Sequence, residues 1–561
     1  MFYPVKVTDV TLRDGQEDFV LKYLHLEDLG WLLGLMDRAG FYSIDCWGGN
    51  TFYAALMDLQ EDPWERLKKT RRALTRTPLQ MILRGNMLVG FKPYQPEVVR
   101  KFIQRAAHLG VDIFRVYDSL NDADNMAVGI ATAKELRKQV EATVLVSPSP
   151  HVTSDDYLAI MAQLVNLGAD VVCINDSLGV MTPHQVAALV TAYRRYFHQP
   201  LRLHLHDNHQ AAIACYQEGV RRGAELVDAT LSALSWPYGP PPLPSLLFSL
   251  GGTAQDPHLD MDVLGEVSEY IDFLKEKYQY REPPPRKVED RLDLAYLPGP
   301  LKDFIREELG RRDARDRQQV AFKEAHQVWD DLGYPALKGR ILEIVGLQAV
   351  ENILSGQRYE KLIPSLQDLL RGKFGRLHTP VQVDLQKRAL AGEEPWGEKT
   401  PESEGRLLTR PDLEKDEDIL TYTLFPEEAQ AFFVQRAEGL APPPRAHPKT
   451  APPPYPFPAP LTTQGLTMTH KGEEAQVSLQ GVGTVRKGKQ VLFITVGDQV
   501  EEIEVQLVSG AGGKPEYLMT FHGDTYRIRI GKAFPKEWEY TPIFLEINGQ
   551  MEEFLIKTPQ G

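Results

Sequence analysis

Residues 5–18 read VKVTDVTLRDGQED, an apolar strand pattern that runs directly into an arginine, an aspartate and a glycine. An open, doubly wound sheet that binds a nucleotide usually has a glycine-rich phosphate turn after its first strand. No such turn follows this strand. The sequence therefore favours another arrangement of parallel strands.

Further short apolar strand patterns follow in the first half of the chain. They alternate with longer helical segments such as PEVVRKFIQRAAHLG and PHQVAALVTAYRRYF. Strands that alternate with helices lie parallel, and eight such units close into a (β/α)8 barrel. We therefore predict an α/β fold with a TIM barrel over residues 1–295. The expected strands are 5–12, 42–47, 79–85, 112–119, 142–148, 170–176, 201–207 and 226–234.

The second half of the chain changes pattern twice. Residues 296–440 carry amphipathic helical segments such as VAFKEAHQVWDDLG, which predict a helical domain. Residues 441–465 begin with APPPRAHPKTAPPPYPFPAP and predict a semi-rigid, proline-rich linker. Residues 466–561 alternate with period two between turn signals, so we expect a small β-rich domain.

Composition excludes several classes of function. The formal net charge of −14 argues against a nucleic-acid or anionic-membrane partner, and no run of about 18 apolar residues exists that could span a membrane. The cysteines, Cys46, Cys173 and Cys215, are few and widely spaced, which fits a reducing compartment. The first residues contain no apolar secretion segment. We therefore expect a cytoplasmic protein.

Reactive side chains follow the predicted strands at the end where TIM-barrel enzymes carry their chemistry. So many at the same end of the repeat indicate a site. They are Arg13, Asp14, Trp47, Arg84, Asp118, Asn175, Asp176, His204, His206 and Asp207.

His204 and His206 lie two residues apart in LRLHLHD, so on a strand both imidazoles point to the same face. Asp14 adds an anionic oxygen from the first strand, which only the eighth strand separates from the seventh. Two imidazoles and a carboxylate suit a borderline divalent metal such as Zn²⁺, Mn²⁺ or Co²⁺. The alternative is a histidine–aspartate ion pair that stiffens the barrel rim.

Arg13 and Arg84 are expected to face the same region. Two guanidinium groups beside a cation suggest a carboxylate substrate bound with bidentate geometry. The alternative for each is an ion pair with a neighbouring acid such as Asp118 or Asp176.

With these residues placed, the sequence resembles the biotin-dependent carboxyltransferase family. That family includes the carboxyltransferase part of pyruvate carboxylase, the α subunit of oxaloacetate decarboxylase and the 5S subunit of transcarboxylase. The resemblance covers nearly the whole chain. It rests on VTDVTLRDGQ, CWGGNTF, EDPWERLKKTRRAL, LRGNMLVGFKPY, DIFRVYDSLND, DSLGVMTP, HLHD and EDILTYTLFPEEAQ.

The resemblance implies a metal-binding barrel followed by a helical funnel for a carboxybiotin arm. In the family the metal polarises the enolate of a 2-oxo acid such as pyruvate, and CO2 moves between biotin and that enolate. Asp14, His204 and His206 match the family's metal ligands. Arg13 and Arg84 match positions associated with the substrate, and we count Asp118 with them as a candidate substrate-binding residue.

The sequence departs from the family at the chemistry. Asn175 stands where the family has a lysine that is carbamylated and bridges to the metal, and Asn208 stands where it has a threonine that carries a proton. An amide is a poor proton carrier, so the adjacent His209 is a candidate for acid–base work. Glu17 replaces a glutamine that contacts the substrate, and would pair with a cationic or neutral group.

Two further departures concern the entrance and the carrier. The family's loop of small residues after the eighth strand reads WPYGPPP here, with Trp236 and Tyr238 filling space. No Met-Lys-Met biotinylation motif occurs. We therefore expect carboxybiotin on a separate biotin carboxyl carrier protein, loaded by a biotin carboxylase subunit, and a homo- or hetero-oligomer.

The prediction is a carboxyltransferase or decarboxylase subunit that acts on a 2-oxo acid such as pyruvate or oxaloacetate. The first alternative is a non-catalytic scaffold or regulatory subunit of a biotin-dependent complex. The second is a lyase similar to hydroxymethylglutaryl-CoA lyase, whose relatives share the RDG strand and the HxH strand and lack the carbamylated lysine.

Overall fold

The computed structural model describes residues 3–235, 239–281, 297–390, 405–408, 410 and 413–438, together with the backbone of strands between 466 and 557. It divides into two compact units, Met1–Lys449 and Thr450–Gly561. The finer boundaries at 295, 440 and 465 stay predictions.

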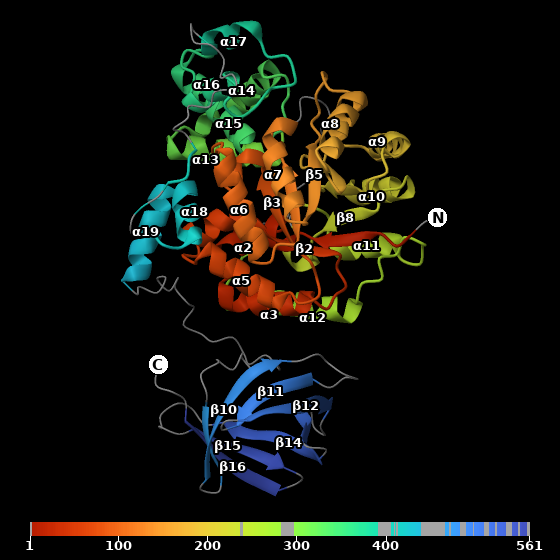
Figure 1. Ribbon diagram of the computed structural model, residues 1–561, viewed down its shortest axis with the longest axis vertical. Helices are drawn as coiled ribbons and strands as arrows, with labels where there is room; N and C mark the ends of the chain where they lie inside the picture. The colour runs from red at the N-terminus through yellow and green to blue at the C-terminus, as the bar shows by residue number, and fades with distance from the viewer. Residues whose placement is uncertain are drawn as a thin grey trace. The chain divides into compact units, whose positions relative to one another are not determined.

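The strands β1 to β8 close into a parallel barrel in which each strand pairs with the next and β8 pairs with β1 (Figure 1). This confirms the α/β TIM barrel. The strands are β1 (Lys6–Asp9), β2 (Ser43–Gly48), β3 (Leu79–Arg84), β4 (Ile113–Tyr117), β5 (Gln139–Leu145), β6 (Val171–Asp176), β7 (Leu201–Leu205) and β8 (Leu226–Ala229).

Amphipathic helices cover the outside of the barrel. A capping box at Thr153 and another at Thr182 satisfy backbone amides at the start of two of them. Among the helices in the described part of the chain, none combines the length and the apolar character that a membrane span requires. The helices of the barrel region are α1 (Thr11–Asp14), α2 (Glu17–Lys22), α3 (Leu26–Met36), α4 (Asn50–Met57), α5 (Pro63–Ala73), α6 (Pro96–His108), α7 (Ala123–Glu135), α8 (Ser154–Asn166), α9 (Pro183–Tyr196), α10 (Ala212–Arg221), α11 (Leu243–Leu250) and α12 (Met261–Lys277).

The first strand is shorter than predicted. Asp9 accepts hydrogen bonds from the backbone amide of Thr11 (3.1 Å) and from its hydroxyl (2.7 Å), which turns the chain into α1. The prediction that this strand reaches residue 12 was wrong, and Asp14 lies on a short helix. The eighth strand also stops early, at Ala229, and a 3-10 turn over Ser232–Leu234 replaces its predicted end.

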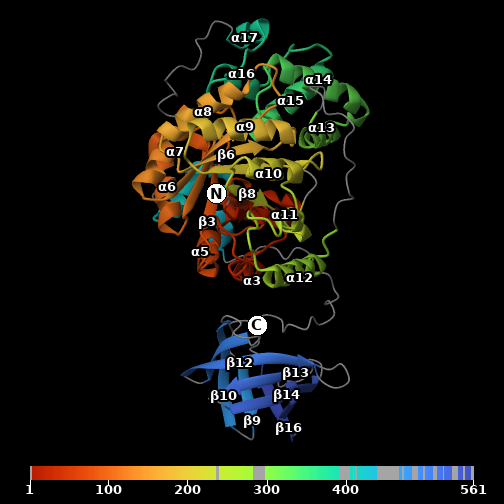
Figure 2. The same ribbon diagram turned by 90° about the vertical axis from the view of Figure 1, so that its right-hand side faces the viewer.

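The first helices of the part that follows share a second apolar core with Met87, Leu120 and Leu178 of the barrel loops. Figures 1 and 2 show α13 to α17 gathered over one end of the barrel, and Figure 1 shows α18 next to α6. The indole of Trp64 donates to the hydroxyl of Thr421 (3.0 Å), which ties α18 to the barrel. These helices are α13 (Gly299–Arg311), α14 (Gln318–Asp331), α15 (Arg340–Ser355), α16 (Pro364–Leu370), α17 (Val383–Leu390), α18 (Asp416–Leu424) and α19 (Pro426–Ala437).

The segment between α14 and α15 enters the mouth of the barrel. Ala336 is buried there against Ile82, Tyr117 and Leu145, which come from β3, β4 and β5. The hydroxyl of Ser147 donates to the carbonyl of Tyr334 (3.0 Å) and holds the segment from the barrel side. The helical part therefore contributes residues to the end of the barrel where the site was predicted.

The second unit is a closed antiparallel barrel in the order β10-β11-β12-β13-β14-β15-β16-β9, in agreement with the β-rich fold predicted for this part of the chain. Its strands are β9 (Leu466–His470), β10 (Glu473–Val482), β11 (Gln490–Val496), β12 (Gln499–Ser509), β13 (Pro515–Phe521), β14 (Asp524–Ala533), β15 (Thr541–Ile547) and β16 (Gln550–Lys557).

Charged side chains, all 0% exposed, fill part of the interior of the first barrel. Arg115 bonds to Asp228 (2.6 Å) and to Glu141 (3.1 Å). Arg202 bonds to the same two acids, each at 2.6 Å. Two guanidinium groups and two carboxylates therefore balance one another's charge, which is a condition for burying ions in a protein core.

We expect Arg115→Met to lower the free energy of unfolding by about 3–5 kcal/mol, because it leaves two buried carboxylates, Asp228 and Glu141, with a single counter-ion, Arg202. Urea unfolding of the full chain with a chelator present, followed by tryptophan fluorescence, measures this loss. The control is Arg221→Met, whose 67% exposed side chain pairs with Glu218; about 0–1 kcal/mol is expected. Equal losses in both variants would contradict a special role for the buried ions.

Candidate metal and substrate site

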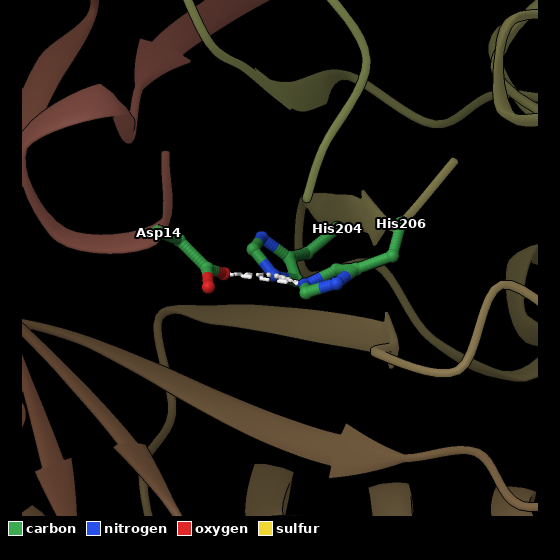
Figure 3. Close-up of side chains that lie close together, drawn as sticks. All are labelled: Asp14, His204 and His206. Atoms are coloured by element: carbon green, nitrogen blue, oxygen red, sulfur yellow. Dashed lines mark hydrogen bonds and ion pairs between the residues drawn. The ribbon is translucent and has the colours of Figure 1, made fainter. Parts of the chain in front are cut away.

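Asp14, His204 and His206 converge at the barrel mouth, as predicted (Figure 3). Oδ2 of Asp14 lies 2.9 Å from Nε2 of His204 and 3.3 Å from Nε2 of His206, and the two ring nitrogens lie 3.2 Å apart. One potential ligand atom from each residue falls within 4.8 Å of the others. One oxygen and two imidazole nitrogens on a common point form a donor set that fits a divalent cation.

Asp228 fixes the orientation of His204. Nδ1 of the fully buried His204 lies 2.7 Å from Oδ2 of Asp228. An ionised carboxylate can only accept, so Nδ1 donates, and Nε2 is the ring nitrogen left to face Asp14 and a metal. A histidine that binds a metal usually has such a partner on its other nitrogen.

The surroundings of the site favour an ionised Asp14 and a neutral His206. Burial would raise the pKa of Asp14, but Arg13 and the histidines hold that pKa well below its usual range. Burial lowers the pKa of His206, although Asp14 opposes this shift. An ionised carboxylate beside a neutral imidazole is the protonation state that metal binding requires.

Arg13 lies between two acids. Its Nε donates to Asp45 (2.7 Å), and its Nη1 lies 3.2 Å from Oδ2 of Asp14. Among the described residues its buried Nη2 has no hydrogen-bond partner. The guanidinium therefore forms ion pairs, as the alternative interpretation expected, but with Asp45 and Asp14 and not with Asp118 or Asp176. One of its donors has no partner among the described residues.

Arg84 is held at the end of β3 by neutral groups. Nη1 donates to the carbonyl of Gly90 (2.9 Å) and Nη2 to the side-chain oxygen of Asn50 (2.5 Å). Its guanidinium also lies 5.5 Å from the ring centre of Phe91. These contacts fix the side chain without neutralising its charge, and substrate binding stays a prediction.

Asp118 faces its own loop. It accepts from the backbone amides of Leu120 (2.9 Å) and Asp122 (3.0 Å), and from the side chain of Asn125 (3.0 Å). Burial raises the pKa of Asp118 to about 6 despite these bonds. The carboxylate closes the turn before α7, and its role in substrate binding stays a prediction.

Asn175 and His204 are direct neighbours in the register of β6 and β7. The Asn175 side chain is buried and accepts a hydrogen bond from the hydroxyl of Ser177. This places the amide next to the metal ligands, at the position for which the family resemblance implied a lysine.

Asn208 and His209 border the loop after β6. The amide of Asn208 donates to the carbonyl of Leu178 (2.6 Å), and Nδ1 of His209 lies 2.8 Å from the carbonyl oxygen of Gly179. The loop thus fixes both side chains. Glu17 begins α2, but its side chain, like Trp236 and Tyr238 as a whole, lies outside the described residues.

The sequence analysis missed the residues that position the ligands. Asp45 holds Arg13, and Asp228 holds His204. Both are acids inside otherwise apolar strands, SIDCWG and LVDA, which is a detectable signal for an inward-facing charge. Lys338, from the helical part, reaches the barrel mouth as well, and no motif pointed to it.

Two family models match the chain, one described as HMGL-like over residues 101–271 and one described as Conserved carboxylase domain over residues 305–487. A pyruvate carboxylase subunit of Methanocaldococcus jannaschii is 35% identical over 442 residues, which are 76% of this chain and 77% of that protein. The chain belongs to the biotin-dependent carboxyltransferase family. The resemblance inferred from the sequence is confirmed.

Two further members of this family extend the match. The 2-oxoglutarate carboxylase large subunit of Hydrogenobacter thermophilus is 31% identical over 530 residues, which are 89% of this chain and 80% of that one. The solved carboxyl transferase domain of Rhizobium etli pyruvate carboxylase, with pyruvate and biocytin, aligns with a TM-score of 0.72 at 26% identity. That alignment covers 90% of this chain and 89% of the solved one.

The raised pKa of Asp118 predicts a pH-dependent stability difference. A buried acid that prefers its neutral form loses stability as the pH rises from its unfolded value near 3.8 through the folded value of about 6. We therefore expect Asp118→Asn to gain stability relative to the unchanged chain between pH 4 and pH 7, by about 3 kcal/mol at most. Urea midpoints across this pH range measure the difference, and a constant offset would refute the shift.

Proposed function

We propose that this chain transfers a carboxyl group between carboxybiotin and a 2-oxo acid such as pyruvate or oxaloacetate. The observation that carries the proposal is the convergence of Asp14, His204 and His206 at the mouth of a barrel whose family transfers carboxyl groups. The relatives named as a pyruvate carboxylase subunit and as a 2-oxoglutarate carboxylase large subunit support this substrate class.

Asp14, His204 and His206 would hold a divalent Zn, Mn or Co ion. Their two nitrogens and one oxygen match the preference of these borderline metals, and the Asp228 contact supports His204 from behind. When bound, such an ion acts as a Lewis acid at the oxygen of the 2-oxo group, which favours loss of a proton from the adjacent carbon.

The protein's own cations would position the acid. Arg13 is fixed by Asp45 and keeps Nη2 as a buried donor without a partner among the described residues, which would favour a carboxylate oxygen beside it. Arg84 is fixed by Asn50 and Gly90, and its remaining charge favours an anion at the end of β3. Rigid donors of this kind hold a substrate in one orientation.

Proton transfer would fall to His209, because the amides of Asn175 and Asn208 do not titrate near neutral pH. His209 is held by the carbonyl of Gly179, in the loop that also receives Asn208. Glu17 would pair with a cationic or neutral group of the substrate. We also count Asp118 in the substrate region because it follows β4.

Carboxybiotin would arrive on a separate biotin carboxyl carrier protein that a biotin carboxylase subunit loads. The names of the relatives support this arrangement, since two of them are subunits of carboxylases. We expect the chain to work in a homo- or hetero-oligomer with these partners.

A non-catalytic scaffold or regulatory subunit is the second candidate. Asn175 receives the hydroxyl of Ser177, and Asn208 donates to Leu178, so both amides at the diverged positions serve the local structure. A site of this kind could keep the fold and the partner surfaces after the chemistry is lost.

Metal content tests the first part of the proposal. We expect the purified chain to contain about one equivalent of Zn, Mn or Co, and Asp14→Asn or His204→Ala to lower metal affinity by about 10- to 100-fold or more. Elemental analysis after dialysis against a metal buffer measures this. His258→Ala is the control, because His258 is exposed and pairs with Asp256 away from the site. A chain without metal after loading would contradict the proposed site.

Carboxyl transfer tests the second part. We expect oxaloacetate to form from pyruvate and a carboxylated carrier, and the rate to fall by about 100-fold or more in His204→Ala, because the Lewis acid and its orientation are lost together. A coupled malate dehydrogenase assay measures the product. No turnover with any 2-oxo acid, combined with stable binding to the carrier and a catalytic paralogue, would favour the scaffold.

A further inference from the structure

Lys338 brings a positive charge from the helical part to the barrel mouth. It lies on the segment between α14 and α15, two residues after Ala336, which is buried against Ile82, Tyr117 and Leu145. This burial anchors the backbone next to Lys338. The side chain is thus held over the end of the strands, although it belongs to another part of the fold.

The contacts of Lys338 lead to the strand that lies beside the histidine ligands. Its Nζ donates to the hydroxyl of Ser177 (2.8 Å), and this hydroxyl donates to the side-chain oxygen of Asn175. Asn175 lies opposite His204 in the strand register. A short hydrogen-bonded chain therefore runs from the ammonium group to Asn175 on β6, the strand next to the one that carries His204.

A second contact places the ammonium group beside the site. Nζ lies 5.6 Å from the ring centre of Tyr117, at the end of β4. Together with the bond to Ser177, which follows β6, this contact places Lys338 between the ends of β4 and β6.

Ser177 and Tyr117 orient the ammonium group of Lys338. A hydroxyl and an aromatic face both favour a cation in a defined position. An ammonium group is a compact, strongly hydrated charge with several donors. Held in one orientation at the mouth of the barrel, it can therefore donate a charge-assisted hydrogen bond to an anionic ligand.

We propose that Lys338 is a substrate-binding residue whose ammonium group binds a carboxylate that enters the barrel mouth. The inference rests on the proposed function, because that function brings small carboxylates to this place. The carboxylate belongs either to the 2-oxo acid or to the carboxyl group on biotin. Both present the same chemistry to the ammonium group, and the two can be distinguished by experiment.

Binding of oxalate to the full-length, metal-loaded chain tests the proposal directly, by isothermal titration calorimetry. We expect Lys338→Gln to weaken oxalate binding by about 10- to 100-fold, because a charge-assisted hydrogen bond is lost, and Lys338→Arg to restore most of it. The control is Lys361→Gln, whose side chain is 71% exposed and pairs with Glu351. Equal oxalate affinity in the unchanged chain and in Lys338→Gln would overturn the proposal.

Transfer kinetics then identify the source of the carboxylate. A higher KM for pyruvate in Lys338→Gln, with kcat and the KM for carboxybiocytin little changed, assigns the contact to the 2-oxo acid. The reverse pattern assigns it to carboxybiotin. Pyruvamide, which has no carboxylate, should bind both chains equally, and an equal loss for pyruvamide would expose a structural effect and overturn the proposal.

The two proposals fail separately. If the unchanged chain transfers carboxyl groups but both KM values are the same in Lys338→Gln, only the role of Lys338 is wrong. If oxalate binding depends on Lys338 but no 2-oxo acid is carboxylated, the anion site stands and the proposed function falls.

Discussion

The charges buried inside the first barrel must satisfy one another, and the rest of the site depends on this constraint. Burial would raise the pKa of Asp228, yet Arg115 and Arg202 hold it well below its usual range. Asp228 therefore stays ionised and fixes Nδ1 of His204. A buried ion that lost its partner would cost several kcal/mol, so the network tolerates little rearrangement.

The same network reaches the other side of the site through Asp45. This acid lies 3.8 Å from Arg115 and 2.7 Å from Arg13, and Arg13 in turn contacts Asp14. The carboxylate ligand and the first histidine are therefore positioned from one interior cluster. Asp14 and His204 are held in one orientation because each contacts a charged residue of this cluster, Arg13 and Asp228 respectively.

Much of the fold could be predicted from sequence because it rests on periodicity. Alternating strands and helices determine the barrel, and the spacing of His204 and His206 places both rings on one face. The ends of strands could not be predicted, since the Asp9 side chain stops β1 by capping Thr11, a local competition that hydrophobic pattern does not record. The partners of Arg13 and the approach of Lys338 depend on contacts between distant segments, which a single sequence does not contain.

Two of the departures from the family, Asn175 and Asn208, contact the same loop after β6. Asn175 neighbours His204 and Asn208 follows β7, whereas the three metal-ligand types are intact. The barrel and the three residues that would bind the cation therefore agree with the family. The side chains that differ, Asn175 and Asn208, lie around these residues. Lys338 lies at this same boundary, hydrogen-bonded to the serine that contacts Asn175.

Closure of the C-terminal barrel has a consequence for assembly. β9 pairs with β10 on one side and with β16 on the other, so the described strands form a ring in which each has two neighbours. A ring of this kind exposes no row of backbone amides and carbonyls to which a foreign strand could add. A partner that recognises this unit must therefore read its side chains or its loops, and strand-to-strand polymerisation is disfavoured from the start.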